Sequence, residues 1–232
     1  MKLRNLILSM AIFSFSIGAI SQTKDWPNLN YFKDTNEKLG LPAAGENRIV
    51  FMGNSITIGW EELCPEFFKG RPYINRGISG QTTPQMLLRF RADVIALQPK
   101  AVVILAGIND IAGNTGPSTR EMIMNNIMSM SELAVANHIS VVLSSVLPAY
   151  DFPWKPGQFP ADKIVTLNKM MKDYAESKGL IYLDYYSSTV DGRRGLKAEL
   201  TEDGVHPTVA GYKVMEPLAE AAIAKALKQK RK

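Results

Sequence analysis

The sequence predicts an α/β protein with three layers, in which a parallel five-stranded sheet lies between two layers of helices. Short apolar runs alternate along the chain with longer segments of helical periodicity. The apolar runs show little internal alternation with polar residues, which is typical of strands that are buried on both faces of a parallel sheet. A length of 232 residues suits one domain with a complete hydrophobic core.

The expected elements follow one another in a regular order. The predicted strands are Arg48–Gly53, Tyr73–Arg76, Ala101–Ala106, Ser140–Val146 and Leu180–Asp184. The predicted helices are Thr83–Ala96, Ser118–Asn137, Asp162–Lys178 and Thr208–Ala226, and another helix opens at Ser55. Residues 22–47 are polar and contain Pro27, Pro42 and Gly45, so we expect them to run over the surface of the domain.

The N-terminus carries a pattern that is typical of a signal peptide. Lys2 and Arg4 precede the apolar stretch LILSMAIFSFSIGAI, and the small residues Ala19 and Ser21 predict cleavage after Ser21. The alternative is a transmembrane anchor, but the stretch is short for a bilayer core of ~30 Å and contains several serines. We therefore expect a signal peptide over residues 1–21, a mature domain over residues 22–232 with no stable membrane span, and a secreted or periplasmic location.

Charge and cysteine content argue against several other classes of protein. The net charge of +5 is concentrated near the two ends of the chain, without a basic stripe interleaved with aromatic residues, so no nucleic-acid partner is expected. Cys64 is the only cysteine, which excludes an internal disulfide and a lipid anchor at the cleavage point. We expect it to be a small buried apolar residue. Since no metal cluster, phosphate loop or dinucleotide fingerprint is visible, no cofactor and no metal are expected.

Polar, glycine-rich segments follow the first three predicted strands. Ser55 follows the first strand, NRGISGQTT the second and AGINDIAGN the third, and EDGVHPTVAGY precedes the last helix. Ligands bind in such sheets outside the carboxyl ends of the strands. These segments are therefore expected to face one crevice.

A serine hydroxyl becomes a good nucleophile only when a base accepts its proton, and histidine is the usual base. Of the two histidines, His138 lies at a helix-to-strand junction that we expect at the opposite edge of the sheet, where its role is structural. His206 follows Asp203 by three residues, and this aspartate is placed to orient the imidazole. Taken alone, the same residues also fit a helix cap at Ser55 and a capped helix-entry loop at Asp203 and His206.

The four segments together, in this order, resemble the SGNH or GDSL-type hydrolase family over about residues 48–215. The resemblance implies a flavodoxin-like α/β/α fold. It implies that GNSIT supplies the nucleophile Ser55, and that DGVHP supplies Asp203 and His206. NRGISGQT would provide Gly80, and GINDIAGN would provide Asn109, as donors to an oxyanion hole that is completed by Ser55.

Two departures from common hydrolase patterns are visible around the serine. The first block of the family more often reads Gly-Asp-Ser, whereas Asn54 occupies the middle position here. That acid is not the catalytic acid of the family, so we expect activity to survive. The G-x-S-x-G elbow is absent because Thr57 stands at its last position, which argues against the α/β-hydrolase fold.

The resemblance implies a carboxylic ester hydrolase with a Ser-His-Asp triad. Export and a soluble body favour short acyl groups, O-acetyl above all, on a carbohydrate. The main alternative is a short-chain acyl-lipid ester, as for lysophospholipases or the platelet-activating-factor acetylhydrolase branch. A catalytically inert carbohydrate-binding module is less expected, because all five site residues are present.

Aromatic residues near the predicted crevice bear on the substrate. The insertion AYDFPWKPGQFPAD at residues 149–162 carries Phe152, Trp154 and Phe159, whose faces suit the C–H faces of a sugar ring. They equally fit a proline-rich loop packed on the body. The other candidates to line the pocket are Trp60, Arg76 and Tyr150, which are also open to a packing or surface role.

Overall fold

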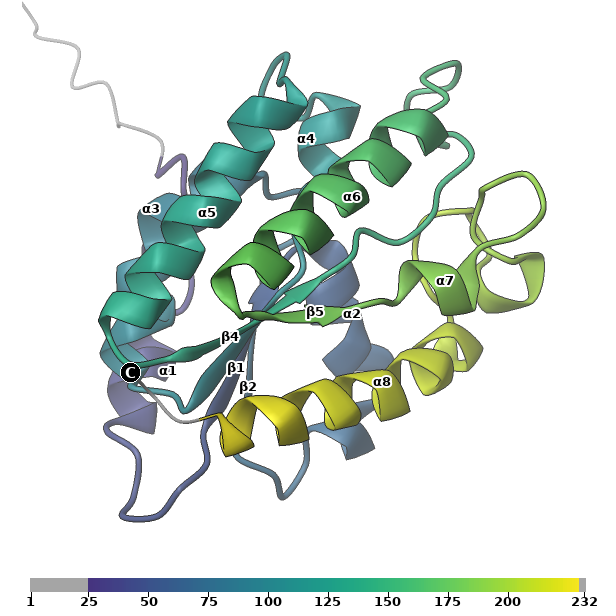
Figure 1. Ribbon diagram of the computed structural model, residues 1–232. Helices are drawn as coiled ribbons and strands as arrows, with labels where there is room; N and C mark the ends of the chain where they lie inside the picture. Colours follow the sequence, from purple (N-terminus) through teal and green to yellow (C-terminus); the bar gives the residue numbers. More distant parts are fainter. Residues whose placement is uncertain (1–24, 230–232) are drawn as a thin grey trace, which may run out of the picture.

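The computed structural model describes residues 25–229, so the predicted signal peptide lies outside the described residues (Figure 1). Its centre is one parallel sheet of five strands in the order β2-β1-β3-β4-β5. The strands are β1 Ile49–Gly53, β2 Tyr73–Gly77, β3 Ala101–Ile104, β4 Ser140–Ser144 and β5 Ile181–Leu183. The predicted α/β architecture and all five predicted strands are confirmed. Between residues 25 and 229, no helix is long and apolar enough to cross a membrane.

Helices cover both faces of the sheet (Figure 1). The helices are α1 Lys33–Leu39, α2 Ser55–Leu63, α3 Thr83–Asp93, α4 Ile108–Ala112, α5 Arg120–Ala136, α6 Ala161–Lys178, α7 Tyr186–Thr189 and α8 Val209–Lys228. Short 3₁₀ turns occupy Pro65–Phe67, Ile95–Leu97 and Ala198–Leu200. Apolar side chains of α3, α5 and α6 share one buried cluster with the sheet, and those of α2 and α8 share the other.

The central strand shows why its sequence is apolar throughout. Successive side chains of a strand point to opposite faces. In β1, Val50 and Met52 belong to the cluster under α3 and α5, whereas Ile49 and Phe51 belong to the cluster under α2 and α8. All four are buried. A strand covered on both faces therefore has no position for a polar side chain until it reaches its end.

The structure differs from the sequence-based expectations mainly in short helices. Helix α3, predicted as Thr83–Ala96, ends at Asp93, because the chain tightens into a 3₁₀ turn and then adopts a left-handed conformation at Gln98. Helix α1 lies within the segment that was expected to be irregular, and none of its residues is buried. This segment does cover the domain surface, since Gln85 Nε2 on α3 donates a hydrogen bond to Trp26 O over 2.7 Å.

Two expectations about single residues are confirmed. His138 has a positive φ of 58° in the turn before β4, which places it at the amino-terminal edge of the sheet. Cys64 is buried and free. His138 therefore lies away from the carboxyl edge, where ligands of such sheets bind, and Cys64 is a buried packing residue.

An aromatic cluster joins α2 and α8 on one face of the sheet. The Trp60 ring stacks against Phe67 at 4.7 Å and against Tyr212 at 5.5 Å between ring centroids. The ring of Phe51 on β1 meets Trp60 edge-on at 5.9 Å. Trp60 is 2% exposed, and its Nε1 has no hydrogen-bond partner in the described part of the chain. Trp60 thus contributes to stability through packing.

We expect Trp60→Ala to lower the free energy of unfolding by about 3–5 kcal/mol, because it opens a cavity at the centre of this cluster. Trp60→Phe should cost much less, since the lost indole N–H leaves no acceptor unpaired within residues 25–229. Urea unfolding followed by fluorescence or circular dichroism measures both. Leu41→Ala, at a position 69% exposed, is the control and should change stability by less than about 0.5 kcal/mol. Equal losses for Trp60→Ala and the control would contradict the packing role.

Candidate active site

The strand-to-helix turn that carries Ser55 lies at the carboxyl edge of the sheet. Strand β1 ends at Gly53, which is paired in register with Gly77 at the end of β2. A Cβ atom on Gly77 would lie 2.8 Å from Asn54 O and closer still to Ile58 N, so no side chain fits there. Because both strands end in glycine, α2 begins directly against β2, and Ser55 is its first residue.

Asn54 caps the helix that Ser55 opens. Its Oδ1 atom accepts a hydrogen bond from Ile56 N over 3.0 Å, which satisfies one of the free N–H groups at the helix start. An aspartate would accept the same bond, so the departure from the usual Gly-Asp-Ser preserves the cap. The other amide atom, Asn54 Nδ2, is buried without a hydrogen-bond partner in the described range.

A chain of two hydrogen bonds joins the three residues of the expected triad. Ser55 Oγ lies 2.9 Å from His206 Nε2, and His206 Nδ1 lies 2.6 Å from Asp203 Oδ2. An ionised carboxylate only accepts hydrogen bonds, so Nδ1 carries the ring proton that Asp203 binds. In the neutral ring Nε2 is then the acceptor, and the hydroxyl of Ser55 donates to it.

A tight turn before α8 holds His206 in this position. Asp203 Oδ1 accepts hydrogen bonds from Val205 N at 2.9 Å and from His206 N at 2.7 Å. Thr201 Oγ1 donates to His206 O over 2.7 Å and accepts from Gly204 N over 3.0 Å. Gly204 has a φ of 82°, a left-handed conformation that glycine adopts readily. The turn therefore fixes the backbone and the ring of His206 together.

The electrostatics of this turn keep Asp203 ionised. Partial burial by itself raises the pKa of the carboxyl, but hydrogen bonds from the His206 ring and from the backbone N–H groups of His206 and Val205 outweigh it. The pKa of Asp203 is lowered from its ordinary value as a result. At neutral pH this side chain is a carboxylate that can stabilise a positive charge on His206.

Gly80 and Asn109 lie in two loops that are bonded to each other. Asn109 Nδ2 donates to Gln81 O over 2.9 Å, and Asn114 Nδ2 donates to Gly80 O over 3.2 Å. Gly80 has a φ of 75°, so the turn uses the conformational freedom of glycine. In the described part of the chain, none of the hydrogen bonds that we observe runs directly from Gly80 or Asn109 to Ser55.

Backbone contacts place these loops on either side of the strand that leads to Ser55. Strands β2 and β3 flank β1 in the sheet. Beyond their ends, Ile78 N donates to Gly53 O over 3.2 Å, and Leu105 N donates to Met52 O over 3.0 Å. The loop with Gly80 and the loop with Asn109 thus both leave the sheet next to the nucleophile turn.

Asp110 is a site residue that sequence reasoning missed. Its buried carboxylate accepts hydrogen bonds from Thr83 N at 3.0 Å and from Thr83 Oγ1 at 2.6 Å, and Thr83 is the first residue of α3. Burial raises the pKa of Asp110, and the bonds from Thr83 offset this only in part. The carboxylate therefore ties the Asn109 loop to the Gly80 loop. Its position directly after Asn109 was the only signal available in the sequence.

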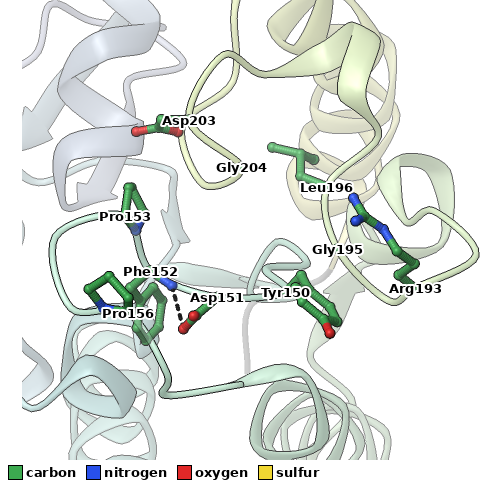
Figure 2. Close-up of a pocket in the computed structure, with 10 residues that line it drawn as sticks. All are labelled: Tyr150, Asp151, Phe152, Pro153, Pro156, Arg193, Gly195, Leu196, Asp203 and Gly204. Atoms are coloured by element: carbon green, nitrogen blue, oxygen red, sulfur yellow. Dashed lines mark hydrogen bonds between the residues drawn. The ribbon is translucent and has the colours of Figure 1, made fainter.

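The segment from Tyr150 to Phe159 forms a compact loop around one carboxylate. Asp151 accepts hydrogen bonds from the backbone N–H groups of Phe152, Gly157 and Gln158 at 2.6–2.9 Å. Figure 2 shows this loop facing Arg193, Leu196 and the Asp203–Gly204 turn across an open cavity of about 290 Å³. A cavity therefore borders the turn that carries His206.

The structure decides between the roles left open for the aromatic and cationic candidates. Trp60 is a core residue, and Arg76 is buried with Nη2 bonded to Asn36 Oδ1 over 2.6 Å. Tyr150 lines the cavity beside Asp203. Trp154 is 46% exposed and lies beside the catalytic candidates, with its ring centroid 5.9 Å from that of His206.

The remaining two aromatic residues of the insertion differ from each other. Phe152 is buried at the edge of the cavity and stacks against Trp154 at 5.2 Å between ring centroids, so it supports that ring. Phe159 is exposed and meets Tyr150 edge-on at 5.8 Å. Across residues 25–229, no group of three or more histidine, cysteine, aspartate or glutamate side chains is arranged to hold a metal ion.

A Ser–His–Asp chain of hydrogen bonds at the carboxyl edge of a parallel sheet is typical of serine hydrolases. Residues 51–214 match the model of the GDSL-like Lipase/Acylhydrolase family, and the chain belongs to this family. It is accordingly a carboxylic ester hydrolase, as the sequence predicted.

Known relatives agree with this assignment. A crystal structure described as that of an acylhydrolase from Bacteroides fragilis is 51% identical with a TM-score of 0.87, over 88% of this chain and all of that one (100%). A GDSL-like lipase from Bacteroides thetaiotaomicron is 48% identical with a TM-score of 0.85, over 87% of this chain and 100% of that one. An acetylxylan esterase from Geobacillus stearothermophilus is 26% identical over 160 residues, which are 67% of this chain and 72% of that protein.

Proposed function

We propose that this protein is an exported serine esterase that removes short acyl groups, acetyl above all, from carbohydrates. The observation that carries the proposal is the hydrogen-bonded chain from Ser55 through His206 to Asp203. In this proposal Ser55 is the nucleophile and His206 is the general base and acid. Asp203 orients the imidazole and stabilises the positive charge that the ring gains when it accepts a proton.

The reaction proceeds in two half-reactions. Ser55 Oγ attacks the carbonyl carbon of the ester while His206 Nε2 accepts the hydroxyl proton. His206 then returns this proton to the oxygen of the departing alcohol, which leaves an acyl-enzyme on Ser55. In the second half, His206 removes a proton from a water molecule that attacks the acyl carbon, and it returns this proton to Ser55 Oγ as the bond between Oγ and the acyl carbon breaks and the acid leaves.

Three N–H donors are available for the negative oxygen of the tetrahedral intermediate. Ser55 N is the first N–H of α2, and such groups have no acceptor within their helix. Gly80 N donates no hydrogen bond within the described residues. Asn109 Nδ2 gives one hydrogen to Gln81 O and retains the other. Each donor of this kind stabilises the transition state by roughly 3–4 kcal/mol.

The carbohydrate preference rests on Trp154. His206 Nε2 must reach the oxygen of the leaving alcohol, so the alcohol half of the ester lies next to His206 during the reaction. Trp154 is the exposed aromatic ring beside it, held from below by Phe152. An aromatic face packs well against the C–H face of a sugar ring. The similarity to an acetylxylan esterase supports the same class of substrate.

Export rests on the N-terminal sequence. Lys2 and Arg4 before an apolar stretch, and the small residues Ala19 and Ser21 after it, predict removal of residues 1–21. A secreted or periplasmic enzyme would meet polysaccharides outside the cell. Export therefore agrees with a carbohydrate ester as substrate.

Ser55→Ala tests the nucleophile. We expect kcat on nitrophenyl acetate to fall at least about 10³-fold, since the acyl-enzyme can no longer form. A fluorophosphonate should label the native protein on the peptide with Ser55, as mass spectrometry would show. Ser177→Ala, an exposed position on α6, is the control and should keep both activity and labelling. Unchanged labelling of Ser55→Ala would reject Ser55 as the nucleophile.

The pH profile tests the roles of His206 and Asp203. His206 accepts a proton only when it is neutral, so kcat/KM should rise with pH along a single ionisation and then level off. Asp203 adds no second ionisation near neutral pH, because its pKa is lowered and it is already a carboxylate there. Rates on a short nitrophenyl ester, measured between about pH 5 and 8, decide this. Two ionisations on the acid limb would contradict the assignment.

A substrate series tests the carbohydrate preference. We expect acetate release from acetylated xylo-oligosaccharides and faster turnover of acetyl than of long-chain nitrophenyl esters. Trp154→Ala should raise KM for the acetylated sugar about tenfold, which corresponds to one lost aromatic contact, and leave KM for ethyl acetate unchanged. Trp154→Phe is the matched control. Fastest turnover of chains of about eight carbons, with no acetate from any sugar, would favour the lipid alternative.

A further inference from the structure

One buried guanidinium lies beneath the loops of the active site. Arg89 on α3 is 0% exposed. Its Nη2 donates to Gly53 O over 3.1 Å and to Arg76 O over 2.8 Å, and its Nε donates to Gln81 Oε1 over 2.5 Å. Its Nη1 donates to Asp93 Oδ2 over 2.9 Å, so the charge is paired. Arg89 therefore connects α3 to the carboxyl ends of two strands.

Two of the acceptors of Arg89, Gly53 O and Gln81 Oε1, belong to residues that lie close to a proposed oxyanion donor along the chain. Gly53 comes two residues before Ser55, and Gln81 directly follows Gly80. Gln81 also accepts the hydrogen bond of Asn109 Nδ2 on its backbone oxygen, over 2.9 Å. A single side chain thus touches the segments of two donors and reaches the third through Gln81.

A guanidinium suits this position because it is planar and presents its donors in fixed directions. Two hydrogen bonds from the same nitrogen set the separation between Gly53 O and Arg76 O, that is, between the ends of β1 and β2. The third bond fixes the side chain of Gln81 relative to both. Arg89 therefore adds one rigid link between the Ser55 turn and the Gly80 turn, beside the backbone bond from Ile78 N to Gly53 O.

Stability alone does not require a buried ion pair at this place. Removing a charge and its partner from water is costly, and apolar replacements of similar volume often leave a protein as stable or more so. The charge of Arg89 has Asp93 as partner, which in turn accepts from Asn36 Nδ2 over 2.7 Å. This arrangement commits several buried polar groups to orienting two backbone oxygens and one glutamine.

We propose that Arg89 is a positioning residue of the esterase: through Gly53 O and Gln81 Oε1 it holds the N–H donors of the oxyanion hole at their working distance from Ser55. The inference rests on the proposed function of Ser55, Gly80 and Asn109. Arg89 does not touch the substrate, so it acts only by keeping the donors aligned when the oxyanion forms.

Arg89→Met and Arg89→Lys test this on a short nitrophenyl ester. Arg89→Met should lower kcat by about 10–100-fold and change KM less than about threefold, because misplaced donors weaken transition-state binding more than substrate binding. Arg89→Lys keeps the charge and some of the donors, so it should lie between Arg89→Met and the wild type. A boronic acid that forms a tetrahedral adduct with Ser55 should bind more weakly by the same factor as kcat/KM falls.

Arg48 offers a matched control for the loss of a buried arginine. It is 2% exposed and precedes β1 at the opposite edge of the sheet, where Nη1 donates to Gly40 O over 2.7 Å and Nε pairs with Glu46 over 2.8 Å. Arg48→Met should lower stability in urea without changing kcat. An equal loss of kcat in Arg48→Met and Arg89→Met would overturn the proposal, since the effect would then be one of general stability.

Variants of Gln81 leave the Arg89 guanidinium in place. They test the positioning role of Arg89 even if Arg89→Met does not fold. Gln81→Met removes the acceptor of Arg89 Nε and should lower kcat with little change in KM. Gln81→Glu keeps an acceptor oxygen at the same position and should retain more of kcat than Gln81→Met. Equal kcat for folded Gln81→Met and the wild type would overturn the proposal.

Failure of this inference is distinguishable from failure of the proposed function. Asn109→Ala should lower kcat by about 10²–10³-fold if the donors act as proposed. A strong effect of Asn109→Ala and Ser55→Ala, with none from Arg89 and Gln81 variants, would reject Arg89 alone. An active Ser55→Ala would reject the proposed function, and the role of Arg89 with it.

Discussion

No side chain fits where the ends of β1 and β2 meet the start of α2, and this constraint sets the position of Ser55, around which the rest of the site is arranged. Gly53 and Gly77 are paired in register, and an added Cβ on Gly77 would collide with the backbone of the turn. The helix therefore begins within one residue of Asn54, with its free N–H groups at the sheet edge. The Gly80 loop, the Asn109 loop and the His206 turn are arranged around that point.

Much of the fold could be predicted, because a strand buried on both faces gives a continuous run of apolar residues in the sequence. Val50 and Met52 face one layer of helices, and Ile49 and Phe51 face the other, so the whole run had to be apolar. Helix α1 was not predicted because none of its residues is buried. A helix without a buried face lacks the apolar periodicity by which a helix is predicted from sequence.

The residues of the site also divide into those that the sequence predicted and those that it did not. Ser55, Asp203 and His206 were predicted because the four segments at the sheet edge resemble, in order, the blocks of one hydrolase family, and the structure brings the three within hydrogen-bonding distance. Arg89 was not, because its contacts with Gly53 and Gln81 depend on how α3 packs against the sheet. In sequence it stands two residues before the exposed Arg91 on the same helix, and nothing there distinguishes the buried arginine from the exposed one.

The loop around Asp151 is held largely by hydrogen bonds within the loop itself. The Asp151 carboxylate accepts hydrogen bonds from backbone N–H groups of the loop, and Lys155 Nζ donates a hydrogen bond to Ala112 O over 2.9 Å. The loop is also anchored to the domain, because the buried side chain of Phe152 belongs to the hydrophobic cluster that α3, α5 and α6 form with the sheet. A change of sequence within the loop can therefore alter the surface beside His206 while the Asp203–His206 turn, which is held by its own hydrogen bonds, stays in place.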